Sequence, residues 1–228
     1  MRNSLFHFTS LLMWFAYYIF TEIRLEGTED LSDWEIIYQQ DFEDIELGKL
    51  PADFFVMDGN FSVQQRDGKR CLVLPGRPVG DYGLLFGPRL TNHFTELKLS
   101  FFATSQGRRF PSLEMGIGGI RGVRLRIDGA LARARINWRD LTENQTSVKW
   151  DSVKWNFLIL RIEQDSHNFI TDCLFKLWSK DSHQPQNWSS ASFASVQSLK
   201  GKCALWGYPY AGTEMLWDTI KIRIPSSN

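Results

Sequence analysis

Short apolar runs separated by turn residues recur along the chain from Ile36 onward, and several of them alternate between apolar and polar residues. In the run that begins at Leu97, every second residue is apolar through Ala103, while Lys98 and Ser100 fall on the other face. Alternation with a period of two predicts strands with one buried and one solvated face, as in antiparallel sheets. No helical period lasts for more than a turn or two. The sequence therefore predicts an all-β protein.

The predicted strands are short apolar or alternating runs bounded by Gly, Pro, Asn or Asp. They are Ile36–Phe42, Phe54–Val56, Phe61–Gln65, Cys71–Leu74, Gly83–Phe86, Glu96–Ala103, Ser112–Gly118, Val123–Ile127, Ala132–Trp138, Ser147–Lys149, Asn156–Gln164, Asp172–Ser179, Cys203–Gly207 and Thr219–Ile224. The segment Asn156–Gln164 is apolar on both faces, which predicts a central strand beneath a second layer. Two antiparallel sheets packed as a β-sandwich, or jelly roll, would accommodate both kinds of strand.

Four glycines fall between Gly116 and Gly122, which raises the question of a phosphate-binding loop. The dinucleotide-binding pattern needs a third glycine where Arg121 stands, and it needs a helix to follow. Here the following residues, Val123 to Ile127, alternate as a strand does. The stretch is therefore predicted to be a β-hairpin whose glycines adopt the positive φ angles of the turn.

The amino terminus carries an apolar run, Leu5–Phe20, after a basic residue. Residues 1–22 are predicted to be a signal peptide or membrane anchor, residues 23–35 a polar linker, and residues 36–226 the folded domain. The run is slightly shorter than the ~20 residues that span a bilayer, and no small-x-small cleavage site is evident. The alternatives are a plain hydrophobic extension or a mis-chosen start site. The prediction is an exported protein, periplasmic, at the cell surface or membrane-tethered, with cleavage of the leader left open.

Charge and cysteine content limit the classes of partner and fold. The 26 basic and 26 acidic residues give a net charge of zero, which argues against nucleic acid as a partner and against membrane contact beyond the amino-terminal segment. The 3 cysteines are too few for a disulfide scaffold. Cys71, Cys173 and Cys203 are predicted to be buried thiols. A Cys173–Cys203 disulfide is the alternative in an exported protein.

Several segments together resemble a known family. They are DFEDIELGKLPADFFVMDGNFSV (Asp41–Val63), DYGLLFGPRL (Asp81–Leu90), GRRFPSLEMGIGG (Gly107–Gly119), WGYPYAGT (Trp206–Thr213) and WDTIKI (Trp217–Ile222). Residues 36–225 resemble bacterial concanavalin A-like jelly-roll domains, and are similar to the LamG-like and 3-keto-disaccharide hydrolase-like domains of exported proteins. The resemblance implies a concanavalin A-like β-sandwich. It leaves function open among carbohydrate-binding modules, glycosidase-like enzymes and accessory domains.

The resemblance also implies which catalytic motifs and metal ligands such a domain would carry. A glucanase of this fold would carry ExDxE or ExDxxE along one strand, and the sequence has no such strand. It has no GxSxG motif and no histidine spacing for zinc, so no catalytic residue is predicted. Acidic residues on the first and last strands of such domains hold a structural Ca²⁺, which implies Glu43 and Asp218 as ligands. The alternative is that these two residues face solvent or cap turns.

A carbohydrate site is predicted from aromatic and planar polar residues, because pyranose rings stack on aromatic faces while Arg and carboxylates bind hydroxyl groups. The candidates are Arg109, Glu114, Arg124, Arg126, Trp206, Tyr208 and Tyr210. The alternative is that Trp206 belongs to the core and the arginines to an ordinary solvated face. The leading hypothesis is an exported, non-catalytic carbohydrate-binding domain with a glycan or polysaccharide partner. A hydrolase of modified (3-keto) sugars and a protein-interaction domain are the alternatives.

Overall fold

The computed structural model describes residues 34–78, 80–91, 94–107, 109–138, 141–165, 170–194, 199–210 and 212–226. The side chains of residues 141–145 and 165 are not among those described. The predicted leader, residues 1–22, lies outside the described residues, as does the predicted linker up to residue 33. Trp34 and Glu35, at the end of that linker, already belong to the first strand. Within the described part of the chain, no helix is long and apolar enough to span a membrane.

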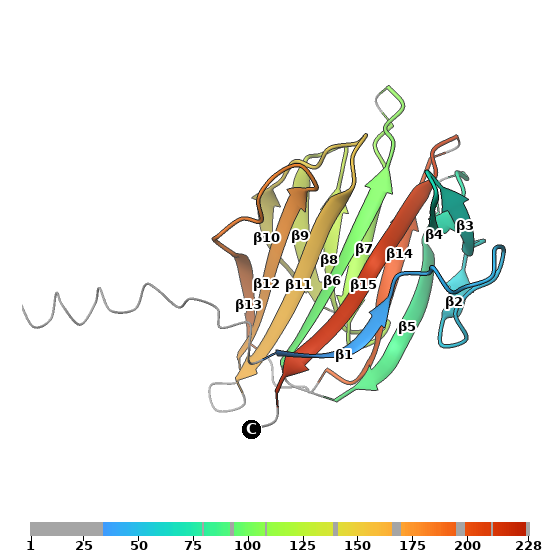
Figure 1. The fold of residues 1–228 in the computed structure, drawn as a ribbon. Helices are drawn as coiled ribbons and strands as arrows, with labels where there is room; N and C mark the ends of the chain where they lie inside the picture. The colour runs from blue at the N-terminus through green and yellow to red at the C-terminus, as the bar shows by residue number, and fades with distance from the viewer. Residues whose placement is uncertain are drawn as a thin grey trace, which may run out of the picture. The chain divides into compact units, whose positions relative to one another are not determined.

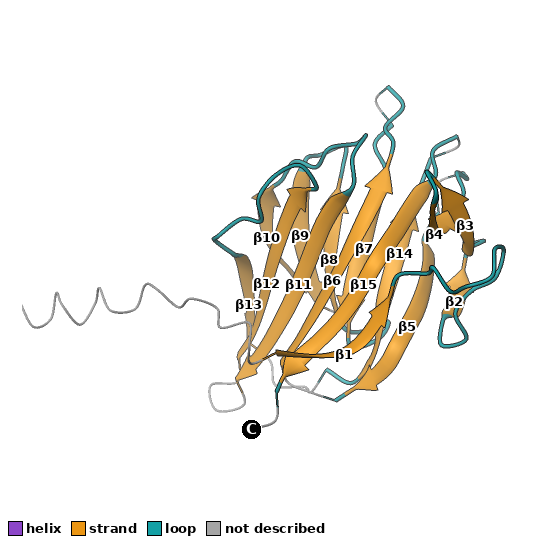
Figure 2. Cartoon of the chain, in the orientation of Figure 1, coloured by secondary structure: helices purple, strands orange, loops and turns teal. Residues whose placement is uncertain are grey.

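The described residues form strands β1 to β15, arranged in two antiparallel sheets (Figures 1 and 2). Sheet A has 8 strands: β13 (Ser189–Ala194), β12 (Ile170–Ser179), β11 (Asn156–Asp165), β6 (Phe94–Ala103), β15 (Met215–Pro225), β4 (Lys69–Leu74) and β3 (Ser62–Arg66) in order, with β1 (Trp34–Gln40) also paired to β15. Sheet B has 7 strands: β10 (Leu141–Ser147), β9 (Arg133–Trp138), β8 (Val123–Asp128), β7 (Ser112–Ile117), β14 (Gly201–Tyr208), β5 (Tyr82–Leu90) and β2 (Phe55–Asp58) in order. The predicted β-sandwich is confirmed.

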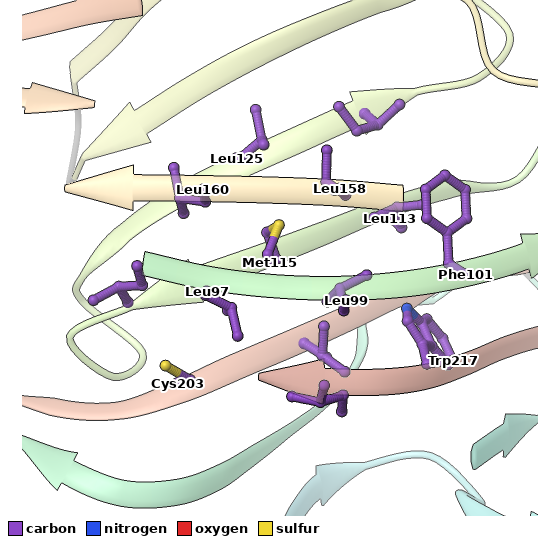
Figure 3. Close-up of a cluster of buried hydrophobic side chains, with 14 of the residues drawn as sticks. Leu97, Leu99, Phe101, Leu113, Met115, Leu125, Leu158, Leu160, Cys203 and Trp217 are labelled. Atoms are coloured by element: carbon purple, nitrogen blue, oxygen red, sulfur yellow. The ribbon is translucent and has the colours of Figure 1, made fainter. Parts of the chain in front are cut away.

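The hydrophobic core lies between the two sheets. On β6 the alternation directs Leu97, Leu99 and Phe101 inward, and on β7 it does the same for Leu113 and Met115, all fully buried. Figure 3 shows these side chains meeting between the layers. Because the period of two fixes which residues face inward, it also fixes which residues the outer face of each sheet presents.

The glycine-rich stretch is a hairpin, as predicted. β7 pairs with β8 from Ser112 opposite Asp128 to Ile117 opposite Val123. Gly118 and Gly119, with φ angles of 95° and 78°, make the turn that joins the two strands. Residues with a side chain rarely adopt such angles, which explains the glycines without a phosphate ligand.

β15 begins at Met215, before the predicted Thr219, and β5 continues to Leu90, beyond the predicted Phe86. The two largest differences from the prediction lie at sheet edges. β13 (Ser189–Ala194) was not predicted because its sequence, SSASFA, has few of the residues typical of strands. β10 occupies Leu141–Ser147, before the predicted Ser147–Lys149, and its sequence, LTENQTS, is polar. β13 and β10 are the end strands of sheets A and B, where one side of the strand has no partner strand and few apolar residues are needed. The central strand predicted from Asn156–Gln164 is β11, between β12 and β6, as expected.

All three cysteines are buried free thiols, as predicted. The alternative of a Cys173–Cys203 disulfide is wrong, because Cys173 lies on β12 of sheet A and Cys203 on β14 of sheet B, and each packs into the core. Burial raises the pKa of the Cys71 thiol to about 11. It also raises the pKa values of Cys173 and Cys203, so all three are protonated and unreactive near neutral pH.

Candidate functional site

The outer face of sheet B brings together most of the residues predicted to bind carbohydrate. Alternation along β7, β8 and β14 directs their side chains away from the core, and β7 lies between the other two strands. The register places Glu114 opposite Arg126 on one side and opposite Trp206 on the other. Arg124 lies two positions before Arg126 on β8, and Tyr208 lies two positions after Trp206 on β14, so both share this face. Residues distant in sequence thus form one row across three strands.

The Trp206 indole lies against the sheet beneath an arginine. The Arg124 guanidinium carbon sits 4.1 Å from the centre of the Trp206 ring. Beneath the indole are two glycines: a Cβ atom at Gly116 would lie 3.1 Å from the indole Cζ3, and one at Gly83 would collide with the ring. Enclosed in this way, Trp206 is only 5% exposed. A sugar ring can stack on Trp206 only if Arg124 moves aside, so that role stays a prediction.

Tyr208 and Arg126 form a second stack of the same kind. The Arg126 guanidinium carbon lies 4.1 Å from the Tyr208 ring centre, and the tyrosine is half-buried. Burial raises the pKa of the Tyr208 hydroxyl, and the negative charge of Glu114 raises it further. Tyr208 is therefore a neutral phenol at ordinary pH, and it supports a guanidinium whose orientation is already fixed.

Two carboxylates lie beneath these arginines and hold them in place. Arg126 donates from Nη1 to Glu114 Oε1 at 2.9 Å and from Nε to Asp128 Oδ1 at 2.6 Å. Asp128 Oδ2 also accepts from Arg133 Nε at 3.2 Å and pairs with Arg135 Nη2 at 2.9 Å. We call this surface the arginine face. It consists of Glu114, Arg124, Arg126, Asp128, Arg133, Arg135, Trp206 and Tyr208.

The arginine face has more positive than negative charge. Its carboxylates, Glu114 and Asp128, are only 6% and 7% exposed, whereas the side chains of its arginines are 24–30% exposed. Burial alone would raise the pKa of Asp128, but hydrogen bonds from Arg126 and Arg133 and the charge of Arg135 outweigh it and lower that pKa. Both carboxylates are thus paired with arginines of the face itself and are not available to a ligand. What the surface offers to a ligand is a set of oriented guanidinium donors, suited to carboxylate, sulfate or hydroxyl oxygens.

Two predicted site residues lie apart from this set. Arg109 is exposed in the connection between β6 and β7, where its backbone pairs with Gln106. Tyr210 lies beyond the end of β14, and its backbone amide donates to Thr213 Oγ1. No described side-chain contact joins either residue to the arginine face, so their roles stay predictions.

Three members of the arginine face were not predicted as site residues: Asp128, Arg133 and Arg135. The signal was present in the alternation. Asp128 continues the series Arg124, Arg126 along β8, and β9 begins with arginines at alternate positions. Extending the period-two pattern of β8 into the next predicted strand would have found them.

The structure does not gather a ligand set around the predicted calcium residues. Glu43 is exposed, and its Oε1 accepts a hydrogen bond from the Arg70 amide at 3.4 Å. Asp218 lies on the outer face of sheet A, where its Oδ1 accepts from the Thr219 amide at 2.6 Å. Among the described residues, no group of three or more His, Cys, Asp or Glu is placed to hold a metal. The residues present therefore do not fit a calcium site, and structural Ca²⁺ stays a prediction.

Thermal melting with and without a chelator tests the calcium prediction. A site that binds Ca²⁺ in the folded state alone would lower the melting temperature on addition of EDTA and restore it on addition of excess Ca²⁺. From the geometry of Glu43 and Asp218 we expect the two melting temperatures to agree. A reproducible drop in EDTA that Ca²⁺ reverses would contradict this expectation and revive the predicted site.

Comparison with known proteins gives no relative by sequence, since no family model and no curated protein matches the chain. Several solved structures do match it. The winged bean acidic lectin, solved with methyl-α-D-galactose, has a TM-score of 0.57 at 10% identity, covering 85% of this chain and all of the lectin. The VIP36 exoplasmic/lumenal domain, bound to Ca²⁺ and Man3GlcNAc, has a TM-score of 0.55 at 8% identity, covering 79% of this chain and 86% of that domain.

The third similar structure is the carbohydrate recognition domain of Emp47p, with a TM-score of 0.52 at 10% identity, covering 87% of this chain and 100% of the domain. At such low identity these matches establish the fold and not a function. The more specific resemblance to bacterial LamG-like domains stays a prediction. The described part of the chain has the concanavalin A-like jelly-roll fold shared by these lectins.

Proposed function

We propose that this protein is an exported or membrane-tethered, non-catalytic carbohydrate-binding domain that holds its glycan on the arginine face. The observation that carries the proposal is the row of guanidinium groups fixed over Trp206 and Tyr208 by stacking and by the buried carboxylates. Such groups lose little freedom on binding, because their orientation is set before the ligand arrives. The amino-terminal leader predicted from the sequence supports export.

The charge of the arginine face favours an acidic glycan. Each buried carboxylate is already paired with arginine, and the arginines outnumber the carboxylates. The Nε atom of Arg135 is buried and has no hydrogen-bond partner among the described residues. A uronate carboxylate or a sulfate ester supplies a pair of negatively charged oxygens, and a guanidinium group can donate two parallel hydrogen bonds to such a pair.

The same geometry favours binding over glycoside hydrolysis at this face. A glycosidase needs one carboxylic acid that stays protonated near its working pH, which requires a raised pKa. Arginine pairing lowers the pKa of Asp128 instead, and Glu114 contacts Arg126 at 2.9 Å. Both carboxylates therefore act as structural anions that position the arginines.

Removing one guanidinium tests the proposal. We expect Arg124→Gln to weaken binding of polygalacturonate or dextran sulfate about tenfold, the usual loss for a charge-assisted hydrogen bond. Arg124 is the suitable position because its contact with Glu114, at 3.6 Å, is looser than those of Arg126, so the fold should tolerate the change. Affinity electrophoresis of the full-length protein against each polysaccharide measures the effect.

The controls separate charge from sugar stacking. Lys49→Gln removes one exposed positive charge beside β3 of sheet A and should leave binding unchanged. Fully methyl-esterified polygalacturonate and unmodified dextran should bind at least ~10-fold more weakly than their acidic forms. If Arg124→Gln strengthens binding, the sugar stacks on the Trp206 ring that the variant uncovers. The proposal that the glycan binds through the guanidinium groups would then be wrong. If no polysaccharide, acidic or neutral, binds the wild-type protein, the proposed function is wrong.

A further inference from the structure

A depression of about 390 Å³ lies on the outer face of sheet A, on the other sheet from the arginine face. Its floor crosses three adjacent strands, because Asp218 of β15 lies opposite Ser100 of β6, and Ser100 lies opposite Phe157 of β11. Small-molecule sites in proteins have volumes of roughly 300–1,000 Å³, so this one suits a compact ligand. We call it the Asp218 depression. The lining residues that matter here are Ser100, Phe102, Trp155, Phe157, Asp218 and Thr219.

A β-bulge in β15 shapes the floor. The register of β15 against β6 shifts between Asp218 and Lys221, and Thr219 has a φ of 51°. A β-branched residue in this region is strained by about 1–3 kcal/mol, and such strain and bulges cluster at functional sites. The shift leaves Trp217 and Ile220 both fully buried in the core, while Asp218 points to the outer face.

No ion pair of Asp218 is described, whereas Glu96, Glu114 and Asp128 on the outer faces of the sheets each pair with arginine. The described hydrogen bonds of the Asp218 carboxylate come from the following residue, Thr219, and the charges of Lys69 and Asp41 act on it as well. Burial raises its pKa and the negative charge of Asp41 raises it further, which the Thr219 hydrogen bonds and the positive charge of Lys69 offset only in part. Asp218 is partly buried, and a partly buried carboxylate with spare acceptor capacity gains when a ligand donates to it.

Aromatic rings form the facing wall of the depression. The rings of Phe102 and Trp155 pack with their centres 5.9 Å apart, and both residues are half-buried. Phe157 is held by stacking on Trp178, with ring centres 5.3 Å apart. An apolar wall beside a hydrogen-bond acceptor suits a ligand with one apolar face and several hydroxyl groups.

We propose that the Asp218 depression binds a single monosaccharide unit. Ring hydroxyls donate to the Asp218 carboxylate, and the C–H face of the sugar packs on Trp155 and Phe102. Lys69 and Lys180, both exposed at the edge of the depression, donate to the remaining ring oxygens and disfavour a cationic ligand. This site is independent of the arginine face, since the two lie on opposite sheets.

Titration of the full-length protein with small sugars tests this inference. The probes are methyl α-mannoside, methyl β-galactoside, N-acetylglucosamine and glucuronate, each to roughly 50 mM, with binding measured by saturation-transfer NMR. We expect at least one to bind with a millimolar Kd. Asp218→Asn should weaken the binding of that sugar about tenfold, because the variant lacks the charged hydrogen-bond acceptor. Trp155→Ala should weaken it to a similar extent, and Trp155→Phe should restore part of the loss.

The folding control rests on the pH dependence of Asp218. Because its pKa in the folded protein is raised above the ordinary value, the ionised carboxylate destabilises the fold above that pKa, and protonation at lower pH relieves the cost. Asp218→Asn should therefore melt at the same or a higher temperature at neutral pH. A loss of sugar binding in this variant then reflects the site and not unfolding.

The outcomes separate the two proposed sites. Monosaccharide binding that Asp218→Asn weakens about tenfold and Arg124→Gln leaves intact supports the Asp218 depression, whether or not acidic polysaccharides bind the arginine face. Binding of a sugar that is unaffected by Asp218→Asn and Trp155→Ala would place that sugar elsewhere and overturn the inference. Failure of all four probes to bind would also overturn it, without bearing on the polysaccharide result.

Discussion

Replacing Trp217 with alanine is expected to lower the free energy of unfolding by about 3–5 kcal/mol. The indole is fully buried on the inner face of β15, with its ring centre 5.9 Å from that of Phe61. Figure 3 shows it within the core beside Leu99 and Phe101. The strand that carries it pairs with β4 on one side and β6 on the other, so neighbouring residues cannot move in to fill the space. Urea denaturation followed by far-ultraviolet circular dichroism measures the loss.

The matched control is Trp217→Phe. The indole Nε1 of Trp217 is buried without a hydrogen-bond partner among the described residues, so phenylalanine removes an unsatisfied donor while keeping most of the apolar ring. We expect this variant to lose less than about 2 kcal/mol. If it loses as much as Trp217→Ala, then Nε1 makes a hydrogen bond in solution, for example to a buried water, and the packing account of this position is wrong.

Strands were predictable where apolar and polar residues alternate clearly, or where the residues on both faces are apolar. β6 and β8 alternate clearly, and β11 is apolar on both faces because long side chains cover its outer side as well as its inner side. The polar edge strands β10 and β13 carry neither signal. The bulge in β15 was not predictable either, since WDTIKI reads as a regular strand and Thr219 is a good strand former. Only packing shows that Ile220 faces inward with Trp217.

The two candidate sites differ in how much of each could be read from the sequence. On the arginine face, the hairpin of β7 and β8 sets Glu114 beside Arg126 through local register alone. The pairing of Trp206 with Glu114 is a contact between distant segments, and alternation alone does not specify it. The Asp218 depression draws its walls from several strands and a loop, so the sequence predicted Asp218 only as a calcium ligand implied by the resemblance and not as part of a depression.

Glu96→Gln is expected to destabilise the protein by about 3–5 kcal/mol, the second large effect. Glu96 is 1% exposed on β6, between Arg161 of β11 and Arg223 of β15. Its Oε2 accepts from Arg161 Nη2 at 2.8 Å, and its Oε1 accepts from Arg223 Nε at 3.0 Å. Glutamine keeps the shape but turns an N–H₂ group toward one of the two arginines and removes their shared counter-charge. Urea denaturation provides the measurement.

The size of this effect follows from burial. The side chain of Arg161 is 7% exposed, and Trp188 covers it, with its ring centre 4.4 Å from the guanidinium carbon. Glu163 lies 3.9 Å from Arg161 but is 37% exposed. In the Glu96→Gln variant it therefore neutralises the charge of Arg161 only weakly. By contrast, Glu46 pairs with Lys49 on the surface, where both side chains are more than half exposed. Glu46→Gln is therefore the matched control and should leave stability unchanged within error.

A triple variant, Glu96→Leu with Arg161→Met and Arg223→Met, separates the value of the ion pairs from the cost of breaking them. Because it removes all three buried charges together, no buried ion of the triad loses its counter-charge, and Glu163, which also contacts Arg161, is 37% exposed to water. Apolar side chains of similar length fill the space. We expect it to recover most of the stability that Glu96→Gln loses. If the triple variant is as unstable as Glu96→Gln, the pairing itself contributes stability beyond its desolvation cost. If Glu96→Gln matches the wild-type protein, water must reach the two arginines in solution, and the burial of this triad would be contradicted.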